Sequence, residues 1–307
     1  MIVIEAKKLT KRYGNGKGVQ ELNLAVNKGE IFGFIGPNGA GKSTTIRMLL
    51  QLIAPTAGEL SILGTRIGGD HPELRARIGY LPSEIRLFPD MTGKQALEFA
   101  AAVHGIELAN SPAARYVERL QLDTKQKIKS YSLGNRKKLG ILLSIVHNPD
   151  LLILDEPTSG LDPLMQQEFY DMLRELNERH GTTIFFSTHV LTEVEKLCDR
   201  VAIIREGRLI RVSTLEEIAA DGGHRIEAMF REPGDKRDEY GIRAIDPGAI
   251  YENGHHIFHV GSSLNDVLKL LSEKQVHELN IRKPTLEERF MDEYRKPQQQ
   301  PQDRSVN

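Results

Sequence analysis

The sequence predicts an α/β protein built on a parallel sheet. Short apolar runs alternate with longer amphipathic stretches over the first two thirds of the chain. The runs at 31–35, 151–154 and 183–186 indicate buried strands, and the stretch 165–179 between the last two indicates a helix. A strand, a helix and a second strand in this order favour parallel pairing through a right-handed crossover.

Shifts of pattern divide the chain into a large domain at 1–220 and a small α+β domain at 224–292. Within the large domain, about 88–148 is expected to form a helical subdomain inserted between strands. Its predicted helices are 93–104, 112–120 and 133–147. The tail at 293–307 is rich in proline and glutamine and is predicted to be disordered.

The small domain is predicted from two strand-like segments and one helix. Residues 225–230 and 256–260 alternate between apolar and polar side chains, and 264–272 has helical spacing. No motif of chemistry is recognisable there, so dimer contact, regulation and simple packing are all open roles for 224–292.

Composition excludes several classes of protein. Acidic and basic residues nearly balance, 42 against 41, so no global charge favours nucleic acid or anionic lipid. The single cysteine, Cys198, rules out an internal disulfide and fits a reducing compartment. No apolar run approaches the ~20 residues of a membrane span, and residues 1–5 do not resemble a signal peptide. A secreted disulfide scaffold, an integral membrane protein and a disordered chain are therefore not expected.

A phosphate-binding loop follows the first buried strand. The pattern G-x-x-x-x-G-K-[ST] is met by Gly36, Pro37, Asn38, Gly39, Ala40, Gly41, Lys42 and Ser43. A predicted helix at 43–52 follows, so backbone N–H groups, including that of Thr44, would face phosphate oxygens. Lys42 would reach the β- and γ-phosphates, and the Ser43 hydroxyl would join Mg²⁺. The alternative is a glycine-rich turn with a chance Lys-Ser pair.

Two carboxylates end the strand at 151–154. Asp155 suits a magnesium ligand and Glu156 suits a general base for the attacking water, because the carboxyl ends of parallel strands line the ligand edge of such sheets. A merely solvated strand end is the alternative. GTPases recognise guanine through the string Asn-Lys-x-Asp, which lies well after the phosphate loop. The nearest string here, at 27–30, precedes that loop and ends in glutamate, so ATP is favoured over GTP.

Over residues 2–220, the order and spacing of these motifs resemble the nucleotide-binding subunit of an ATP-binding cassette (ABC) transporter. The resemblance implies a P-loop NTPase fold of the ABC type with a helical subdomain. Tyr13 matches the aromatic residue that stacks on adenine, Asp162 ends the family's D-loop, and His189 matches the switch histidine near the γ-phosphate. A surface tyrosine and a structural histidine are the alternatives for Tyr13 and His189.

Two motifs depart from the family pattern. The segment 131–136 stands where the family carries Leu-Ser-Gly-Gly-Gln. It keeps Ser132 and Gly134 but departs at Tyr131, at Leu133, which replaces a glycine, and at Asn135. Ser83 stands where the Q-loop glutamine is expected. The string Gly-Tyr-Leu-Pro-x-Glu at 79–84 nevertheless resembles exporter-type subunits whose membrane domains are separate chains, as does the segment 284–290.

The resemblance implies an ATPase that powers a membrane transporter, as an exporter of the drug, lipid or peptide class. ATP and Mg²⁺ would be its cofactors, with Ser132, Gly134 and Asp162 contacting ATP held by a second copy in a homodimer. The other partner would be an integral membrane permease on a separate chain, with no nucleic acid. The expected location is cytoplasmic, on the inner face of the cell membrane. The alternatives are a soluble ABC-type ATPase acting on ribosomes or DNA, and a weakly hydrolysing, regulatory ATP-binding cassette.

Two surface predictions follow from the segment after the Q-loop and from the signature helix. Ile85, Leu87, Phe88 and Pro89 offer apolar groups either to a partner's helix or to the chain's own core. The cluster at 136–138, Arg-Lys-Lys, is expected to face solvent or phosphate.

Overall fold

A six-stranded, mostly parallel sheet carries the motifs singled out above. The computed structural model describes residues 1–14, 16–220, 223–230, 241–261, 264–285 and 288–289. The chain divides into two compact units, Met1–Leu215 and Glu216–Asn307. The predicted tail at 293–307 lies outside the described residues. Among the described helices, none is both long and apolar enough to cross a membrane.

The central sheet confirms the predicted parallel arrangement. Its strand order is β10-β9-β3-β8-β7-β6, and all neighbours run parallel except β10 against β9. The strands are β3 (Ile31–Ile35), β6 (Ile78–Leu81), β7 (Leu151–Asp155), β8 (Thr183–Thr188), β9 (Arg200–Arg205) and β10 (Arg208–Thr214). Ile35 pairs with Thr188, and Asp155 with Ser187, so three strands end at one edge.

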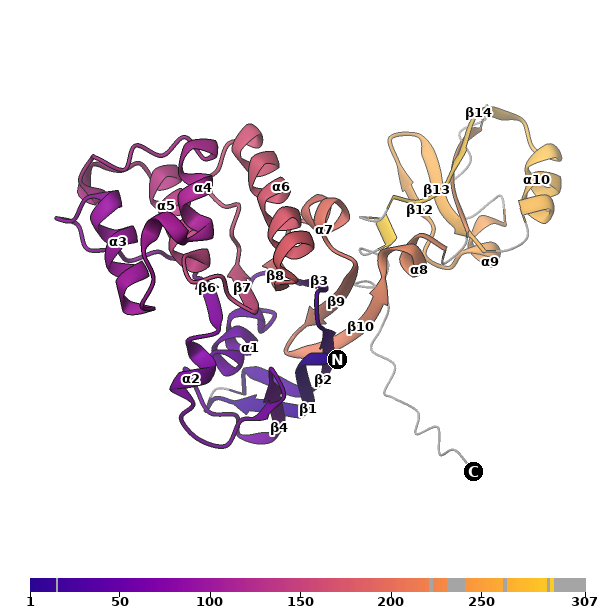
Figure 1. Cartoon of the computed structure of the whole chain (residues 1–307). Coiled ribbons are helices and arrows are strands. Elements are labelled where there is room, and N and C mark those ends of the chain that lie inside the picture. The colour runs from indigo at the N-terminus through magenta and orange to yellow at the C-terminus, as the bar shows by residue number, and fades with distance from the viewer. Residues whose placement is uncertain (15, 221–222, 231–240, 262–263, 286–287, 290–307) are drawn as a thin grey trace. The chain divides into compact units, whose positions relative to one another are not determined.

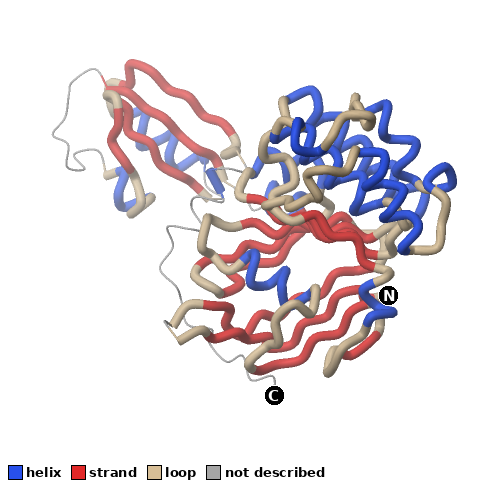
Figure 2. The backbone as a smooth tube through the Cα atoms, turned by 90° about the vertical axis from the view of Figure 1, so that its left-hand side faces the viewer, coloured by secondary structure: helices blue, strands red, loops and turns tan. Residues whose placement is uncertain are grey.

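Helices cover one face of this sheet and extend into a separate helical group (Figures 1 and 2). The helices are α3 (Gly93–Val103), η1 (Leu108–Asn110), α4 (Pro112–Arg119), η2 (Ile128–Ser130), α5 (Leu133–Ile145), α6 (Pro163–His180) and α7 (Leu191–Leu197). The three helices predicted for the helical subdomain are confirmed as α3, α4 and α5, each ending one or two residues early. Arg119 of α4 joins this group to α6 through ion pairs with Glu168 and Glu175, at 2.5 and 2.6 Å.

The other face of the central sheet is covered by α1 (Lys42–Leu49), which Figure 2 shows lying between two sheets. Its Ile46, Met48 and Leu49 are fully buried in one core with residues of both sheets. The second sheet is antiparallel in the order β2-β1-β4-β5, from β1 (Ile2–Arg12), β2 (Gly18–Asn27), β4 (Ala57–Ile62) and β5 (Thr65–Arg66). A short helix, α2 (Pro72–Arg75), precedes β6.

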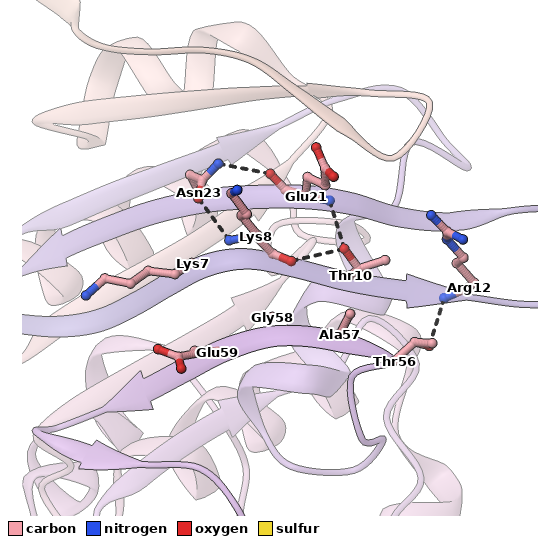
Figure 3. Close-up of a pocket in the computed structure, with 10 residues that line it drawn as sticks. All are labelled: Lys7, Lys8, Thr10, Arg12, Glu21, Asn23, Thr56, Ala57, Gly58 and Glu59. Atoms are coloured by element: carbon pink, nitrogen blue, oxygen red, sulfur yellow. Dashed lines mark hydrogen bonds between the residues drawn. The ribbon is translucent and has the colours of Figure 1, made fainter. Parts of the chain in front are cut away.

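Irregular pairing shapes the outer face of this antiparallel sheet. Lys8 of β1 and Glu21 of β2 both have positive φ, 48°, and the β1–β2 register shifts between Ala6 and Leu9. The Thr10 hydroxyl bridges the irregularity by donating to Lys8 O and accepting from Glu21 N (Figure 3). A concavity of about 700 Å³ lies here, and none of its lining residues belongs to the nucleotide motifs.

The second unit is an α+β fold whose described strands form a sheet in the order β12-β13-β11-β14. Its elements are α8 (Leu215–Ala220), β11 (His224–Phe230), α9 (Ile242–Ile245), β12 (Ile250–Glu252), β13 (His255–Val260), α10 (Leu264–Ser272) and β14 (Val276–Arg282). Ile226, Phe258 and Leu271 belong to its own small hydrophobic core. The outer side of β11 and β14 carries Arg225 and Arg282, which both pair with Glu288.

Glycine at position 33 of β3 allows a helix to approach the sheet closely. A Cβ there would lie 3.0 Å from the sulfur of Cys198, which follows α7 and is buried. Burial raises the pKa of the Cys198 thiol far above its ordinary value. This cysteine is therefore a packing residue of the core.

Candidate nucleotide site

The phosphate loop joins β3 to α1 in the shape that the sequence predicted. Gly39 and Gly41 have φ values of 81° and 110°, which residues with a side chain rarely adopt. At Gly36 a Cβ would lie 2.4 Å from Ile204 O, so the backbone passes too close to β9 for any side chain. Lys42 begins α1 and is buried, and its ammonium donates to Gly36 O at 2.7 Å. The loop is thus folded around the lysine.

Two hydroxyls hold the carboxylate of Asp155. Ser43 Oγ donates to Asp155 Oδ2, and Ser187 Oγ donates to Asp155 Oδ1, each at 3.2 Å. The structure therefore brings together Ser43 and Asp155, the two residues predicted to bind magnesium. Hard oxygen donors of this kind suit Mg²⁺, which usually keeps only one or two protein ligands beside phosphate and water. No group of three or more His, Cys, Asp or Glu side chains suited to a metal occurs in the described part of the chain.

Glu156 occupies an unusual backbone conformation at the carboxyl end of β7. Its φ is 47°, in the left-handed region, which costs a non-glycine residue on the order of 1 kcal/mol. Both of its backbone groups are bonded, since its N–H donates to Ser187 O at 3.0 Å and its C=O accepts from Lys137 Nζ at 2.9 Å. Its carboxylate lies 3.5 Å from Lys42 Nζ and 3.1 Å from His189 Nδ1.

Lys137 corrects the expectation for the basic cluster at 136–138. It lies on α5 with 2% of its surface exposed, and its ammonium contacts Glu156 rather than solvent. Burial lowers the pKa of Lys137 to about 8, against the opposing effect of the carboxylates of Asp155 and Glu156. The helical spacing contained the signal, because Lys137 lies four residues before Ile141 and eight before Ile145, both buried on the same face.

A buried carboxylate that the sequence analysis did not identify links two of the motifs. Glu193 of α7 accepts hydrogen bonds from Thr158 Oγ1 and from Thr188 Oγ1, the latter at 2.5 Å. Thr158 precedes the D-loop and Thr188 precedes His189. Glu193 therefore connects the segment that follows Glu156 to the end of β8, beside His189. Only its position shortly after β8 could have suggested this.

The signature and D-loop residues serve local roles within their own chain. Ser132 Oγ accepts from Asn135 N at 3.2 Å and caps α5, while Asp162 Oδ1 accepts from Met165 N at 3.0 Å and caps α6. Leu133 is 65% exposed and packs against the D-loop, since a Cβ on Gly160 would lie 3.0 Å from its Cδ2. The side chain that replaces the family's glycine thus has a contact in this chain.

The structure joins some of the predicted site residues and leaves others apart. A hydrogen bond joins Ser43 to Asp155, and an ion pair and a second close contact join Glu156 to Lys42 and His189. In the described part of the chain, no such contact reaches this cluster from Tyr13, Ser132, Gly134, Asp162 or Ser83. The Tyr13 ring is 39% exposed just beyond β1, with the Lys11 ammonium 5.8 Å from its centroid, and Ser83 is exposed.

A second concavity, of about 370 Å³, lies between the segment after β6 and the helical group. Its apolar lining includes Leu87, Met91 and Phe99, together with Phe88, which is 68% exposed. Ile85 behaves differently, because it packs against α5 at Gly140, where a Cβ would lie 2.6 Å from Ile85 Cδ1. Ile85 therefore completes the core, whereas Phe88 faces outward.

Comparison with known proteins identifies the family of the chain. The family model described as "ABC transporter" matches residues 19–159. The bacitracin transport ATP-binding protein BcrA of Bacillus licheniformis is 42% identical over 220 residues, which are 71% of this chain and 70% of that protein. The daunorubicin resistance ATP-binding protein DrrA3 of Streptomyces coeruleorubidus is 34% identical over 293 residues, 92% of each chain.

Solved structures show the same fold. One is an ATP-binding subunit of an ABC transporter that is 31% identical in sequence. The match covers 71% of this chain and 92% of that chain, with a TM-score of 0.63. Another is a dimeric ATP-binding cassette in a post-hydrolysis state, bound to ADP and Pi, that is 26% identical in sequence. The match covers 69% of this chain and 99% of that chain, with the same TM-score.

The parallel sheet, the phosphate loop and the paired carboxylates define a P-loop nucleoside triphosphatase of the ATP-binding cassette type. The chain belongs to the family of ABC transporter ATP-binding proteins, as the relatives and the family model show. It is an ATPase subunit of a transporter. The alternative of a soluble ABC-type ATPase that acts on ribosomes or DNA is therefore not supported.

Proposed function

We propose that this chain is the ATP-hydrolysing subunit of an exporter and works as a homodimer beneath a permease on a separate chain. The observation that carries the proposal is the cluster at the ends of β7 and β8, where the Glu156 carboxylate lies between the Lys42 ammonium and the His189 ring. A carboxylate between a phosphate-binding lysine and a histidine is suited to polarise a water that attacks the γ-phosphate.

Each residue of the cluster has a distinct role in this proposal. Lys42 exchanges its contacts with loop carbonyls for the β- and γ-phosphate oxygens, and the backbone N–H groups from Gly39 to Thr44 surround the phosphates. Glu156 accepts the proton of the attacking water. His189 lies against Glu156 and contacts the γ-phosphate region. Tyr13 stacks on the adenine ring through its exposed face.

Ser43 and Asp155 are the proposed magnesium ligands, because their oxygens already lie together at the edge of the phosphate loop. When bound, the ion would neutralise charge on the β- and γ-phosphates. Ser187 holds the Asp155 carboxylate from the other side, so the ligand set needs little rearrangement.

The homodimer follows from what the single chain leaves apart. Ser132, Gly134 and Asp162 do not reach the chain's own phosphate loop, so a second copy would present them to the ATP of the first. Exposed apolar side chains flank these motifs, with Leu133 beside the cap of α5 and Leu164 beside the cap of α6. Exposed apolar groups at such positions favour association over solvent.

The apolar concavity at Phe88 is the proposed docking site of the permease. It lies directly after Ser83, the Q-loop position, so a permease helix seated there would contact the segment leading from β6. The names of the relatives, bacitracin transport and daunorubicin resistance, support drug or peptide export as the process. The proposed location is accordingly cytoplasmic, on the inner face of the membrane.

Glu156→Gln tests the proposal. The variant is expected to lose ATP turnover by about 100-fold or more while binding ATP with Mg²⁺ at wild-type affinity and accumulating as an ATP-bound dimer. Glu178→Gln, an exposed glutamate on α6, is the matched control. Wild-type turnover in Glu156→Gln would overturn the assignment of the base, and a wild-type chain that binds ATP without turnover beside its permease would favour the regulatory cassette.

Phe88→Asp tests the docking site. The variant is expected to keep the ATPase activity of the isolated chain, because Phe88 is 68% exposed, and to lose binding to the permease and transport. Loss of folding or of basal ATPase activity would instead make Phe88 part of the chain's own core.

A further inference from the structure

Lys137 is buried where an apolar side chain would cost less. Removing an ammonium group from water is unfavourable unless hydrogen bonds compensate, and lysine is seldom fully buried without a partner. Here the residue is 2% exposed and one hydrogen bond, from Nζ to Glu156 O at 2.9 Å, is formed. The position lies inside α5, whose other buried residues include Leu139, Gly140 and Ile141.

The atom that Lys137 contacts belongs to a residue held in a costly backbone conformation. Glu156 has a φ of 47°, and its N–H is fixed by Ser187 O. The hydrogen bond from Lys137 fixes the other end of the same residue. The two backbone bonds together set the direction of the Cα–Cβ bond, from which the carboxylate reaches Lys42 and His189.

We propose that Lys137 is a positioning residue for ATP hydrolysis: its ammonium holds the Glu156 backbone in the left-handed conformation that aims the carboxylate at the γ-phosphate site. The inference rests on the proposed role of Glu156 as general base. Lys137 lies outside the motifs described above, since the signature segment ends at residue 136. The proposal gives this lysine a function.

The location of Lys137 has a second consequence within the proposed dimer. Ser132 caps the same helix five residues earlier, about 7.5 Å along its axis. Within the proposed dimer, helix α5 would therefore carry both Ser132, which contacts the ATP of the other copy, and Lys137, which holds Glu156.

The test compares Lys137→Met, which keeps the length and loses the donors, with Lys137→Gln, which keeps a neutral N–H donor. Lys138→Met, on the same helix and only partly buried, is the control. The readouts are kcat, KM for ATP, ATP affinity and the unfolding midpoint, measured on the full chain.

For Lys137→Met we expect kcat to fall on the order of 10- to 100-fold, because a displacement of about 1 Å is enough for such a loss. KM and ATP affinity should stay within about threefold, since no ATP contact is removed. Lys137→Gln should recover part of kcat, and Lys138→Met should match the wild type. In the Glu156→Gln background, adding Lys137→Met should leave the residual single-turnover rate unchanged.

Distinct results separate this inference from the assignment of Glu156. If Glu156→Gln abolishes turnover while Lys137→Met keeps kcat within twofold of the wild type, the positioning role is wrong and the base assignment stands. If Glu156→Gln keeps turnover, the base assignment fails. If Lys137→Met lowers the unfolding midpoint and ATP affinity together and Lys137→Gln recovers no kcat, the lysine is structural and the inference is overturned.

Discussion

Protonation of Glu288 should weaken the second unit of the chain in acid. The Glu288 carboxylate accepts two hydrogen bonds from Arg282, at 2.6 and 2.7 Å, lies 3.1 Å from Arg225, and accepts from Thr285 N at 2.8 Å. The bond from Arg282 is the main reason that the pKa of Glu288 falls to about 2. These contacts tie β11 and β14 to the segment that follows β14.

The size of the effect follows from the two pKa values. The ordinary value of 4.5 and the folded value of about 2 differ by roughly two units, which corresponds to about 3 kcal/mol. A fifth of the side chain is exposed, so solvent screening reduces this to about 2 kcal/mol. Because the folded pKa is the lower one, the contribution is complete above pH 4.5 and is lost as the pH falls through 2.

Hydrogen exchange read by mass spectrometry checks this prediction on the full chain. Peptides from β11 and β14 should lose protection in Glu288→Gln at pH 7, by a factor equivalent to about 2 kcal/mol, and the difference from the wild type should shrink towards pH 2. Glutamine keeps the capping geometry with Thr285, so charge is the variable. Glu252→Gln, an exposed residue of the same unit, is the control. Equal protection of Glu288→Gln and wild type at pH 7 would refute the reasoning.

Three further substitutions are predicted to act through single contacts. Gly79→Ala should destabilise the chain by about 2 kcal/mol or more in urea unfolding, because the added Cβ would lie 2.1 Å from Ser144 O, a backbone atom. Ser132→Ala should cost about 1 kcal/mol through loss of the cap on α5, and Ser132→Thr should restore it. Arg119→Met should lower the unfolding midpoint at pH 7, since it removes the cation that pairs with both Glu168 and Glu175, two partly buried carboxylates of α6.

The sequence predicted β3, β7 and β8 of the central sheet because their residues are buried on both faces, whereas β6, β9 and β10 were not predicted as strands. Residues 31–35 and 151–154 are continuous apolar runs, and the structure contains them as β3 and as β7, the latter extended to Asp155. The phosphate loop was equally clear, since its glycines and lysine have fixed spacing. Sequence reasoning also placed Asp155 and Ser43 at one site, which the 3.2 Å hydrogen bond between them fits.

What the sequence did not reveal depends on contacts between distant segments. The antiparallel sheet of β1, β2 and β4 was not predicted, because the irregularity at Lys7 and Lys8 interrupts the alternation that marks a strand. The contact of Lys137 was likewise hidden, since its helical spacing could indicate burial but not the partner of its ammonium group. Only the fold brings its ammonium to Glu156 O, 19 positions away.

The packing of Cys198 against Gly33 makes the chain convenient for cross-linking chemistry. The thiol is buried and remains protonated at neutral pH, so maleimides and mild oxidants have little access to a thiolate there. It is also the sole cysteine of the 307 residues. If Phe88 is replaced by cysteine in the otherwise unchanged chain, the new thiol would therefore be the reactive one. Disulfide trapping between this thiol and single cysteines introduced into a permease could then map the docking site residue by residue.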